Sequence, residues 1–336
     1  MLWLFIQEMI KFGLFYALAN KRIHSNAPLD PDENWSFWTK PQHPALKLLF
    51  RSYPPSFIRK KILNKMLQSS HAEGIEAHYD ISNDFYGLFL DSVYRFYSCA
   101  DFITPSDTLE KAQKNKAANI KSLLRLSGKE KILDLGCGWG AMLKYLNDRG
   151  HQGNLYGFTL SKEQALYCVD NLGLDVSLRN FITSPFSKNT FDRIYSIGAM
   201  EHVKPNEIDN VYKKMFDALT PGGLTVHQFF SLNHESYPAS MVMAQLFFPG
   251  SLLVLHKTHI EAAQNAGFKI TYDSIHDYKP TLRAWYENLV KNSEKAIDMV
   301  GLHLYNKYMT FFPISWLFFQ FKEADVHRIV LEKPLS

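Results

Sequence analysis

The sequence has 336 residues, of which 46% are hydrophobic and 21% are charged. These proportions are typical of a globular chain and exclude an intrinsically disordered one, and the length fits one large domain or a domain with an added helical part. The net charge is +4, and all of the excess lies before His78, where there are 10 Lys and Arg against 6 Asp and Glu. A basic segment suits an anionic membrane surface as well as it suits a solvated helix, whereas no arginine-rich tract or nucleic-acid motif argues for DNA or RNA.

The first 20 residues are strongly apolar, with Gln7, Glu8 and Lys11 grouped on one helical face. Two charges near the middle argue against a membrane-spanning helix, and no basic n-region precedes the apolar part as a signal peptide requires. We expect an amphipathic helix in the membrane interface, and a helix packed on the protein's own core is the alternative. It belongs to a predicted N-terminal helical segment, residues 1–77.

Two stretches complete this segment. Residues 27–55 are rich in Pro and Trp and predict a connecting segment, and residues 57–68 alternate basic and apolar residues at helical spacing.

The three cysteines lie after this segment, at positions 99, 137 and 168, and show neither CxxC pairing nor metal-ligand spacing. The sequence therefore predicts no disulfide framework and no metal site, and a reducing, cytoplasmic setting fits best.

A glycine-dense turn, KILDLGCGWG, lies near the centre of the chain. Residues 132–135 predict a short buried parallel strand, and residues 141–147 predict the helix that follows the turn. Gly136 and Gly138 permit positive φ and let backbone N–H groups approach a ligand at the helix N-terminus. The G-x-G-x-G spacing is tighter than that of dinucleotide-binding turns, and a turn without a ligand is the alternative.

Strands and helices alternate along the rest of the chain. This rhythm predicts a doubly wound, mainly parallel α/β sheet in a domain of residues 78–336, with a helical insertion at about residues 231–305. Further strands are predicted at residues 154–158, 191–197, 224–230 and 326–331, and helices at residues 109–126 and 208–219, the second ended by Pro221-Gly222-Gly223.

Taken together, these stretches resemble the cyclopropane-fatty-acid synthase family, which includes the mycolic acid cyclopropane synthases. The matching segments, in order, are HYDISNDFYGLFLD, YSCADF, ILDLGCGWG, GFTLSKEQ, FDRIYSIGAMEHV, LTPGGL, FFPG and DYKPTLRAW, and they extend over roughly residues 74–333. The resemblance implies a class I methyltransferase with a seven-stranded, Rossmann-like sheet that uses S-adenosyl-L-methionine (SAM). It also implies that SAM contacts Tyr97, Ser98, Gly136, Gly138, Thr159, Leu160 and Gln164. For the family's adenine-side acidic residue the nearest match is Asn180.

Four residues from distant segments make up the catalytic set that the resemblance implies: Cys99, Glu201, His227 and Tyr278. In the family these positions surround a bound bicarbonate that serves as the base. Each also has an ordinary interpretation, as a small buried thiol, a satisfied core histidine or a packing aromatic. Glu201 follows a predicted strand at the carboxyl edge of the sheet, where α/β folds bind ligands, and a carboxylate among apolar residues is costly without partners.

The implied reaction transfers a methyl group from SAM to a cis double bond of an unsaturated phospholipid acyl chain and closes a cyclopropane ring. We therefore expect a cytoplasmic enzyme that is peripheral at an anionic membrane; a homodimer is left open. Gln228 and Phe229 stand where the family usually has Thr-Ile, and Met200 replaces a usual Phe. Three alternative functions stay open: formation of a methyl-branched lipid, methylation of a small amine, and binding without catalysis. Candidate acyl-channel residues, with core packing as the alternative, are Phe247, Phe248, Phe311, Phe312, Trp316, Phe318 and Phe319.

Overall fold

The computed structural model describes residues 2–40, 83–233, 243, 246–247 and 253–335, with side chains from residue 13 onward. Two compact units divide the chain. The helical unit consists of residues 1–89, 232–252 and 278–324, and the sheet unit consists of residues 90–231, 253–277 and 325–336. Parts of the predicted N-terminal segment and of the predicted insertion thus share one unit, while the predicted boundary at residues 77 and 78 lies outside the described residues, as does the predicted helix at 57–68.

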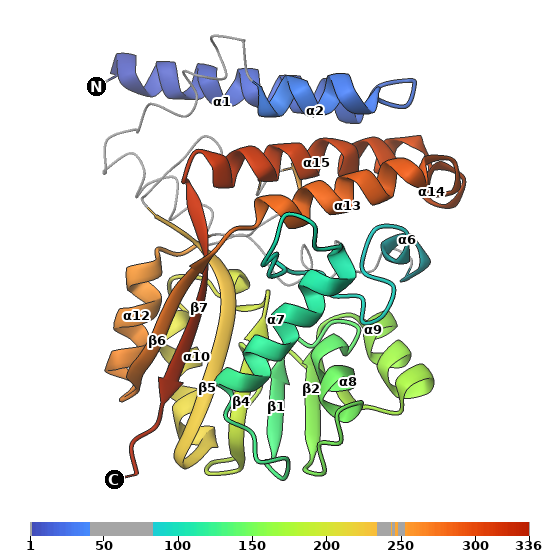
Figure 1. Cartoon of the computed structure of the whole chain (residues 1–336). Coiled ribbons are helices and arrows are strands. Elements are labelled where there is room, and N and C mark those ends of the chain that lie inside the picture. The colour runs from blue at the N-terminus through green and yellow to red at the C-terminus, as the bar shows by residue number, and fades with distance from the viewer. Residues whose placement is uncertain (1, 41–82, 234–242, 244–245, 248–252, 336) are drawn as a thin grey trace. The chain divides into compact units, whose positions relative to one another are not determined.

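The sheet has seven strands in the order β3-β2-β1-β4-β5-β7-β6 (Figure 1). Pairing is parallel from β3 through β5, and β6 runs antiparallel to β7, which confirms the predicted mainly parallel, doubly wound α/β sheet. The strands are β1 (Ile132–Leu135), β2 (Leu155–Thr159), β3 (Asp175–Leu178), β4 (Phe191–Ile197), β5 (Leu219–Leu232), β6 (Lys269–His276) and β7 (Ala324–Glu332).

Helices connect the strands of the sheet unit. They are α7 (Leu109–Leu123), α8 (Ala141–Asn147), α9 (Lys162–Leu166), α10 (Ile208–Ala218) and α12 (His256–Asn265), with a π-helical turn (Tyr167–Asn171) after α9 and a 3-10 turn (Met200–His202) after β4. The predicted helices at 109–126, 141–147 and 208–219 are therefore confirmed, with ends that differ by at most a few residues. Thr108 begins α7 as its N-cap, because its side chain accepts a hydrogen bond from the Lys111 backbone N–H.

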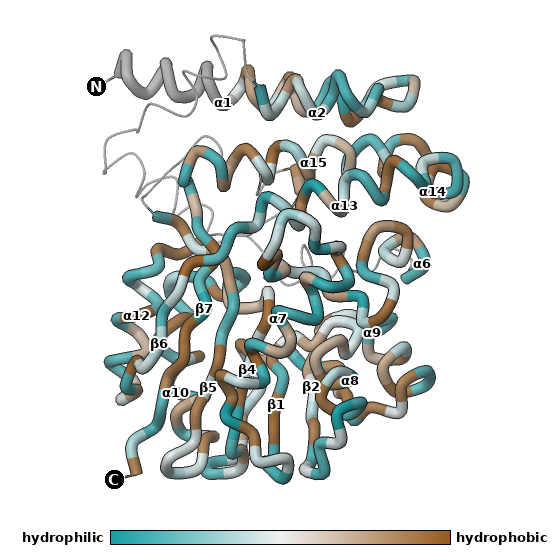
Figure 2. Tube along the Cα trace, viewed as in Figure 1, coloured by the Kyte–Doolittle hydropathy of each residue, from teal (hydrophilic) through white to brown (hydrophobic). Residues whose placement is uncertain are grey.

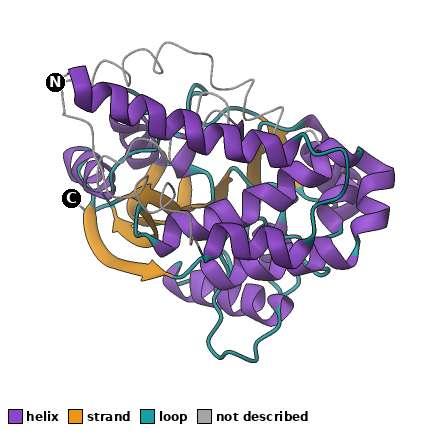
Figure 3. Ribbon diagram, turned by 90° about the horizontal axis from the view of Figure 1, so that it is seen from above, coloured by secondary structure: helices purple, strands orange, loops and turns teal. Residues whose placement is uncertain are grey.

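Alternate strand residues divide the core between the two faces of the sheet. In β1, Leu133 and Leu135 pack with α10 and α12, whereas Ile132 packs with α7 and α8 on the other face. The central strands are apolar along most of their length (Figure 2). Both faces of a parallel strand are covered by helices, so its residues are buried without alternation, and all four residues of β1 are buried. Seen from above, a long strand at one side of the sheet is strongly curved (Figure 3).

The helical unit is built on α15. This helix is apolar on nearly every side, and α1, α2, α13 and α14 contact it. Phe15, Ala19 and Ile23 lie four residues apart on α1 and are buried, and the Phe15 ring packs edge-on against Trp38 of α2. Among the described residues, no helix is both long and apolar enough to cross a bilayer. The elements are α1 (Leu2–Ile23), α2 (Pro31–Thr39), α6 (Asn83–Gly87), α13 (Lys279–Lys291), α14 (Ser293–Val300) and α15 (Leu302–Gln320).

Part of the predicted connecting segment at residues 27–55 is a helix, α2, so the prediction was wrong there. Asp30 caps the helix by accepting a hydrogen bond from the Glu33 backbone N–H at 2.8 Å, and Pro31 occupies the first turn. Proline is favourable at this position because its missing N–H has no partner there in any case. Asp-Pro followed by acidic residues is a helix-start pattern that the high Pro content obscured.

Strand β5 begins five residues earlier than predicted, at Leu219, directly after α10 ends. Its register against β4 passes from Leu219 opposite Phe191 to Leu224 opposite Arg193, so the Pro-Gly-Gly stretch forms an irregularity inside the strand and does not separate helix from strand. Gly222 takes a φ of +73°, and Pro and Gly are tolerated in strands at such bulges.

Candidate active site

The glycine turn joins β1 to α8 and lies against the end of β2. The Gly136 and Cys137 backbone N–H groups donate to the Phe158 carbonyl at 2.9 and 2.8 Å. Gly136 (φ +85°) faces Ala199, where a Cβ would lie 2.6 Å from the Ala199 Cβ. Gly138 (φ +55°) differs, because no atom of the described residues lies within 4 Å of its Cβ position. Space beside Gly138 is therefore open to a ligand, as a cofactor cradle requires.

Three predicted SAM contacts lie at the end of β2 and just beyond it, beside this turn. Thr159 and Gln164 are buried, and the Thr159 hydroxyl donates to the Gln164 Oε1 at 2.7 Å. Ser161 caps α9 by accepting from the Gln164 N–H, which fixes Gln164 over the strand end, and Leu160 is half-buried between them. Because β1 and β2 are parallel neighbours, the glycine turn and Thr159 occupy adjacent strand ends. Asn180 accepts a bond from the Ile182 N–H at 2.9 Å and so caps a turn of its own.

Tyr97 and Ser98, the remaining predicted SAM contacts, approach the same edge at Gly198. A Cβ at Gly198 would lie 3.6 Å from the Ser98 Cβ, 3.8 Å from the Tyr97 carbonyl oxygen and 3.7 Å from the Glu201 Oε1. The segments before α7 and after β4 thus meet at a residue without a side chain. This places Glu201 close to the segment that contains Cys99.

Lys116 supports this segment and is not among the predicted site residues. Its Nζ donates to the Ser98 hydroxyl at 2.7 Å and lies 3.9 Å above the centre of the Phe96 ring. Burial lowers the pKa of Lys116 to about 7, and the neighbouring Asp91 opposes that shift. The sequence does contain a signal for it, because Lys116 lies four residues after Ala112 and four before Ile120 on the buried face of α7.

Glu201 lies in the 3-10 turn after β4 and is 6% exposed. Within the described part of the chain, its Oε2 has no hydrogen-bond partner. Burial raises the pKa of Glu201 to about 8, because the ionised form loses its hydration without gaining a counter-charge. At neutral pH this carboxyl group therefore holds its proton and can donate a hydrogen bond to an anion.

Cys99 is fully buried, and its backbone is fixed by a neighbouring strand. Its carbonyl accepts from the Gln228 Nε2 at 2.9 Å, and its Sγ lies 3.5 Å from the Asp277 carbonyl oxygen. Burial raises the pKa of the Cys99 thiol to about 12, with the Asp101 charge adding to the shift. The sulfur is therefore a thiol and not a thiolate, which excludes a cysteine nucleophile and leaves a weak S–H donor.

A buried arginine organises the residues around Cys99. Arg328 on β7 is fully buried and donates to Asp101, to Asn119 and to the Gln228 Oε1. His276 adds a second partner, its Nδ1 lying 3.2 Å from the Asp101 Oδ1. These hydrogen bonds hold the pKa of Asp101 well below its usual range, against the effect of burial. Gln228, one of the departures from the family pattern, is thus the link between Arg328 and the Cys99 backbone.

His227 lies on β5 in the core of the sheet unit. Its Nδ1 is 2.8 Å from the Ser196 hydroxyl and its Nε2 is 2.7 Å from the Thr225 hydroxyl, and burial lowers its pKa to about 3. A neutral imidazole with both nitrogens engaged reaches a ligand only by exchanging one of these hydroxyl partners. The ring of Phe229, the other departure on β5, packs 4.2 Å from that of His259.

Tyr278 belongs to the helical unit, where it lies directly before α13. Its ring contacts Trp285 at 5.7 Å and Phe319 at 5.1 Å between ring centres. The structure therefore gathers Cys99 and Glu201 near Gly198 within the sheet unit and describes Tyr278 among aromatics of the helical unit. The catalytic roles of all four residues stay predictions.

Most of the predicted acyl-channel residues pack against aromatic side chains of the helical unit. Phe311 and Phe312 contact each other at 5.5 Å, and Phe247 contacts Phe311 at 5.1 Å, all between ring centres. Phe318 and Phe319 are also buried, Trp316 is half-buried, and Phe248 lies outside the described residues.

Known proteins share both the sequence and the fold. The family model described as mycolic acid cyclopropane synthetase matches residues 67–329. Hydroxymycolate synthase MmaA4 of Mycobacterium tuberculosis is 33% identical over 284 residues, which cover 78% of this chain and 93% of that protein. The structure of the cyclopropane synthase MmaA2 from Mycobacterium tuberculosis matches with a TM-score of 0.73 and 28% identity, covering 79% of this chain and 99% of that one. A crystal structure of the mycolic acid cyclopropane synthase CmaA1 complexed with SAH and CTAB matches with a TM-score of 0.72 and 29% identity, over the same shares.

The seven-stranded sheet and the match to this family over most of the chain together define a SAM-dependent methyltransferase. The chain belongs to the mycolic acid cyclopropane synthetase family.

Proposed function

We propose that this enzyme transfers a methyl group from SAM to the cis double bond of an unsaturated phospholipid acyl chain and closes a cyclopropane ring, with bicarbonate as the base. The observation that carries the proposal is Glu201, a buried carboxyl group beside the segment that contains Cys99, whose Oε2 has no hydrogen-bond partner among the described residues. Such a group is costly to keep without a ligand, because an unsatisfied buried polar atom destabilises the fold by roughly 1–3 kcal/mol.

SAM supplies an electrophilic methyl group on a cationic sulfonium. The chain's own contribution is to hold the donor beside Gly138 and to orient it through Thr159 and Gln164 at the neighbouring strand end. An alkene is a weak nucleophile, so its attack on the methyl group depends on close and aligned positioning of both partners. Fixed glycine backbone and a hydrogen-bonded Thr-Gln pair are suited to this task because neither has to reorganise when substrate arrives.

After methyl transfer, positive charge develops on the neighbouring carbon, and a proton must leave the added methyl group for the ring to close. Bicarbonate suits that task because it is both an anion and a base. Glu201, protonated at neutral pH, would donate a hydrogen bond to it. The Cys99 thiol could act as a second donor only by leaving the Asp277 carbonyl, which lies 3.5 Å from its Sγ. An ionised carboxylate would instead repel the anion, so the raised pKa of Glu201 is part of the proposal.

A methyl-branched lipid is the alternative product, and one observation favours it: this chain has Gln228 and Phe229 where the family usually has Thr-Ile. If the cation loses its proton from another carbon of the acyl chain instead of from the added methyl group, the product is methyl-branched. In either case we infer an enzyme that works in the cytoplasm, peripheral at an anionic membrane, with the N-terminal apolar residues as its contact.

The test compares wild-type protein with Glu201→Leu, which removes the donor, with Glu201→Gln, which keeps a neutral donor of the same shape, and with Glu163→Gln, an exposed control on α9. All three variants are expected to bind SAM as the wild type does. Glu201→Leu is expected to lose turnover on unsaturated phospholipid vesicles by about 10²-fold or more, and Glu201→Gln is expected to lose less. Mass spectrometry of the lipids reads out a gain of one CH₂ in the acyl chain, and ring-specific chemistry separates a cyclopropane from a branch. Wild-type turnover by Glu201→Leu, or methylation confined to an amine, would refute the proposal.

A further inference from the structure

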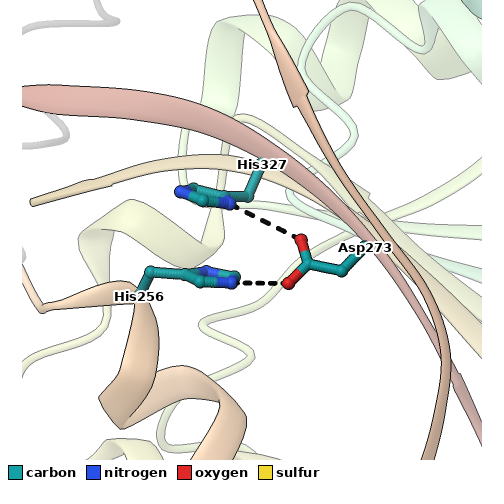
Figure 4. A group of neighbouring side chains, drawn as sticks. All are labelled: His256, Asp273 and His327. Carbon is teal, nitrogen blue, oxygen red and sulfur yellow. Dashed lines mark hydrogen bonds and ion pairs between the residues drawn. The ribbon is translucent and has the colours of Figure 1, made fainter. Parts of the chain in front are cut away.

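Three side chains from separate elements of the sheet unit converge on one point away from Glu201 and the glycine turn: His256, Asp273 and His327 (Figure 4). The His256 Nε2 lies 2.7 Å from the Asp273 Oδ2, and the His327 Nδ1 lies 3.5 Å from the Asp273 Oδ1. The two imidazole rings are stacked, with their centres 3.5 Å apart and their planes within 8°.

The fold fixes these positions through strand register. Asp273 pairs with Ile329, and His327 pairs with Ile275, so Asp273 and His327 are diagonal neighbours on one face of the antiparallel β6–β7 pair. Diagonal residues of an antiparallel pair lie within reach of long side chains. His256, the first residue of α12, completes the group from a third element. The pairing of β6 and β7 therefore fixes the backbone positions of two of the three side chains, as a preorganised binding site requires.

The hydrogen bond between His256 and Asp273 satisfies only one of the four imidazole nitrogens in the group, the His256 Nε2. Within the described residues, the His256 Nδ1 and both ring nitrogens of His327 have no hydrogen-bond partner. The His327 side chain is only 6% exposed, so water is not a general substitute. A buried imidazole with both nitrogens unsatisfied, turned toward a carboxylate and a second imidazole, is what remains when a ligand is missing from such a site.

We propose that His256, Asp273 and His327 form a binding site for a divalent transition metal of the Zn²⁺ class. Two imidazoles and one carboxylate are the donors that zinc takes in three-ligand sites, with water in the fourth position. Calcium and magnesium are excluded because they take oxygen donors almost alone. Asp273 is 37% and His256 is 20% exposed, so an ion can reach the group from solvent.

The donor spacing lies on both sides of the value that a tetrahedral ion requires. The His256 Nε2 is 2.7 Å from the Asp273 Oδ2, and one donor atom from each residue lies within 4.8 Å of the others. Donors about 2.1 Å from a tetrahedral ion are about 3.4 Å apart. Metal binding would therefore lengthen the His256–Asp273 contact and shorten the wider ones, a change that side-chain rotation of the half-exposed Asp273 would provide.

Metal at this point would join the start of α12 to both strands of the β6–β7 pair. The group also lies against β5, because the Phe229 ring is 6.4 Å from the rings of both His256 and His327. We therefore expect the ion to stabilise the sheet unit. The expected readout is a rise in the unfolding midpoint of several degrees at saturating metal.

The test uses full-length, tag-free protein treated with chelator, titrated with Zn²⁺ by calorimetry and with Co²⁺ by visible absorption. Wild type is expected to bind one equivalent, and bound Co²⁺ is expected to show the intense bands of a tetrahedral site. Asp273→Asn and His256→Asn are each expected to weaken binding by more than about 100-fold. Both positions are partly exposed, so these variants are expected to fold, which circular dichroism verifies.

His303→Asn is the matched control. His303 and His24 also form a close ring pair, 4.4 Å between centres, in the helical unit, and no ion pair of His303 with a carboxylate is recorded in the described part of the chain. This variant is expected to bind Zn²⁺ as the wild type does. Failure of the wild type to bind, or equal affinity in Asp273→Asn and the wild type, would overturn the proposal.

Discussion

Arg328 and Asp101, 227 positions apart in sequence, form a bidentate pair in which two guanidinium N–H groups donate to the two carboxylate oxygens, each at 2.9 Å. The arginine is fully buried, and its remaining donors reach Asn119 and Gln228. Because Gln228 in turn donates to the Cys99 carbonyl, the pair fixes the position of the Cys99 segment against β5 and β7.

Asp101→Asn is expected to lower the free energy of unfolding by about 3 kcal/mol, because it leaves a buried guanidinium without its counter-charge. We also expect kcat to fall more than the affinity for SAM, since the Cys99 segment loses its anchor while the glycine turn is untouched. Urea unfolding and steady-state kinetics measure the two effects.

Asp148→Asn is the control for Asp101→Asn. It removes one partner of the Lys144–Asp148 surface pair on α8, and such pairs contribute less than about 1 kcal/mol. Equal stability losses in the two variants would show that Arg328 does not depend on Asp101.

Glu201 makes stability depend on pH. Its pKa is about 8 in the folded state against 4.5 unfolded, so between these values the native state retains a proton that the unfolded state releases. The free energy of unfolding therefore falls as pH rises from about 4.5 to about 8, and Asp134, whose pKa burial also raises to about 8, adds to the same trend.

Glu201→Gln is expected to flatten this dependence by up to about 1.4 kcal/mol per pH unit and to make the protein more stable than wild type at pH 8. Urea unfolding at pH 5, 6.5 and 8 measures the slope, with Glu163→Gln as the exposed control. Identical slopes in wild type and Glu201→Gln would contradict the raised pKa.

Alanine substitutions at Gly136 and Gly138 are expected to have different effects. Gly138→Ala introduces a Cβ into open space, so we expect about 1 kcal/mol of backbone strain and an affinity for SAM weakened by about tenfold or more. Gly136→Ala drives a Cβ to 2.6 Å from Ala199, and its principal effect is a loss of stability of roughly 3 kcal/mol. Calorimetric SAM binding and thermal unfolding distinguish them, and unchanged SAM affinity in Gly138→Ala would remove that glycine from the cofactor site.

The proposed membrane attachment through the N-terminus can be tested with a partial deletion. Phe15, Ala19 and Ile23 are buried in the helical unit and are kept, while residues 2–12 are deleted. The deletion is expected to abolish co-sedimentation with anionic vesicles. The unfolding midpoint is expected to stay within a few degrees of wild type, because these three buried side chains are kept. Undiminished co-sedimentation would assign the membrane contact to another part of the chain.

Local sequence patterns were enough to predict the glycine turn, the buried strands β1 and β4, and the helices α7, α8 and α10. These features follow from local patterns, in which apolar runs, glycines and helix caps act over a few residues. The sequence also indicated the family, and through it the candidate SAM contacts and the catalytic set.

Contacts between residues far apart in the sequence could not be predicted and were seen only in the folded chain. The antiparallel register of β6 and β7 places Asp273 beside His327, and no spacing along the chain predicts that meeting. Likewise, Arg328 lies in an apolar strand and Lys116 on an apolar helix face, and both are hydrogen-bonded to residues at least 18 positions away. A buried charge is stable only where the fold supplies its hydrogen bonds, so the local sequence does not explain either residue.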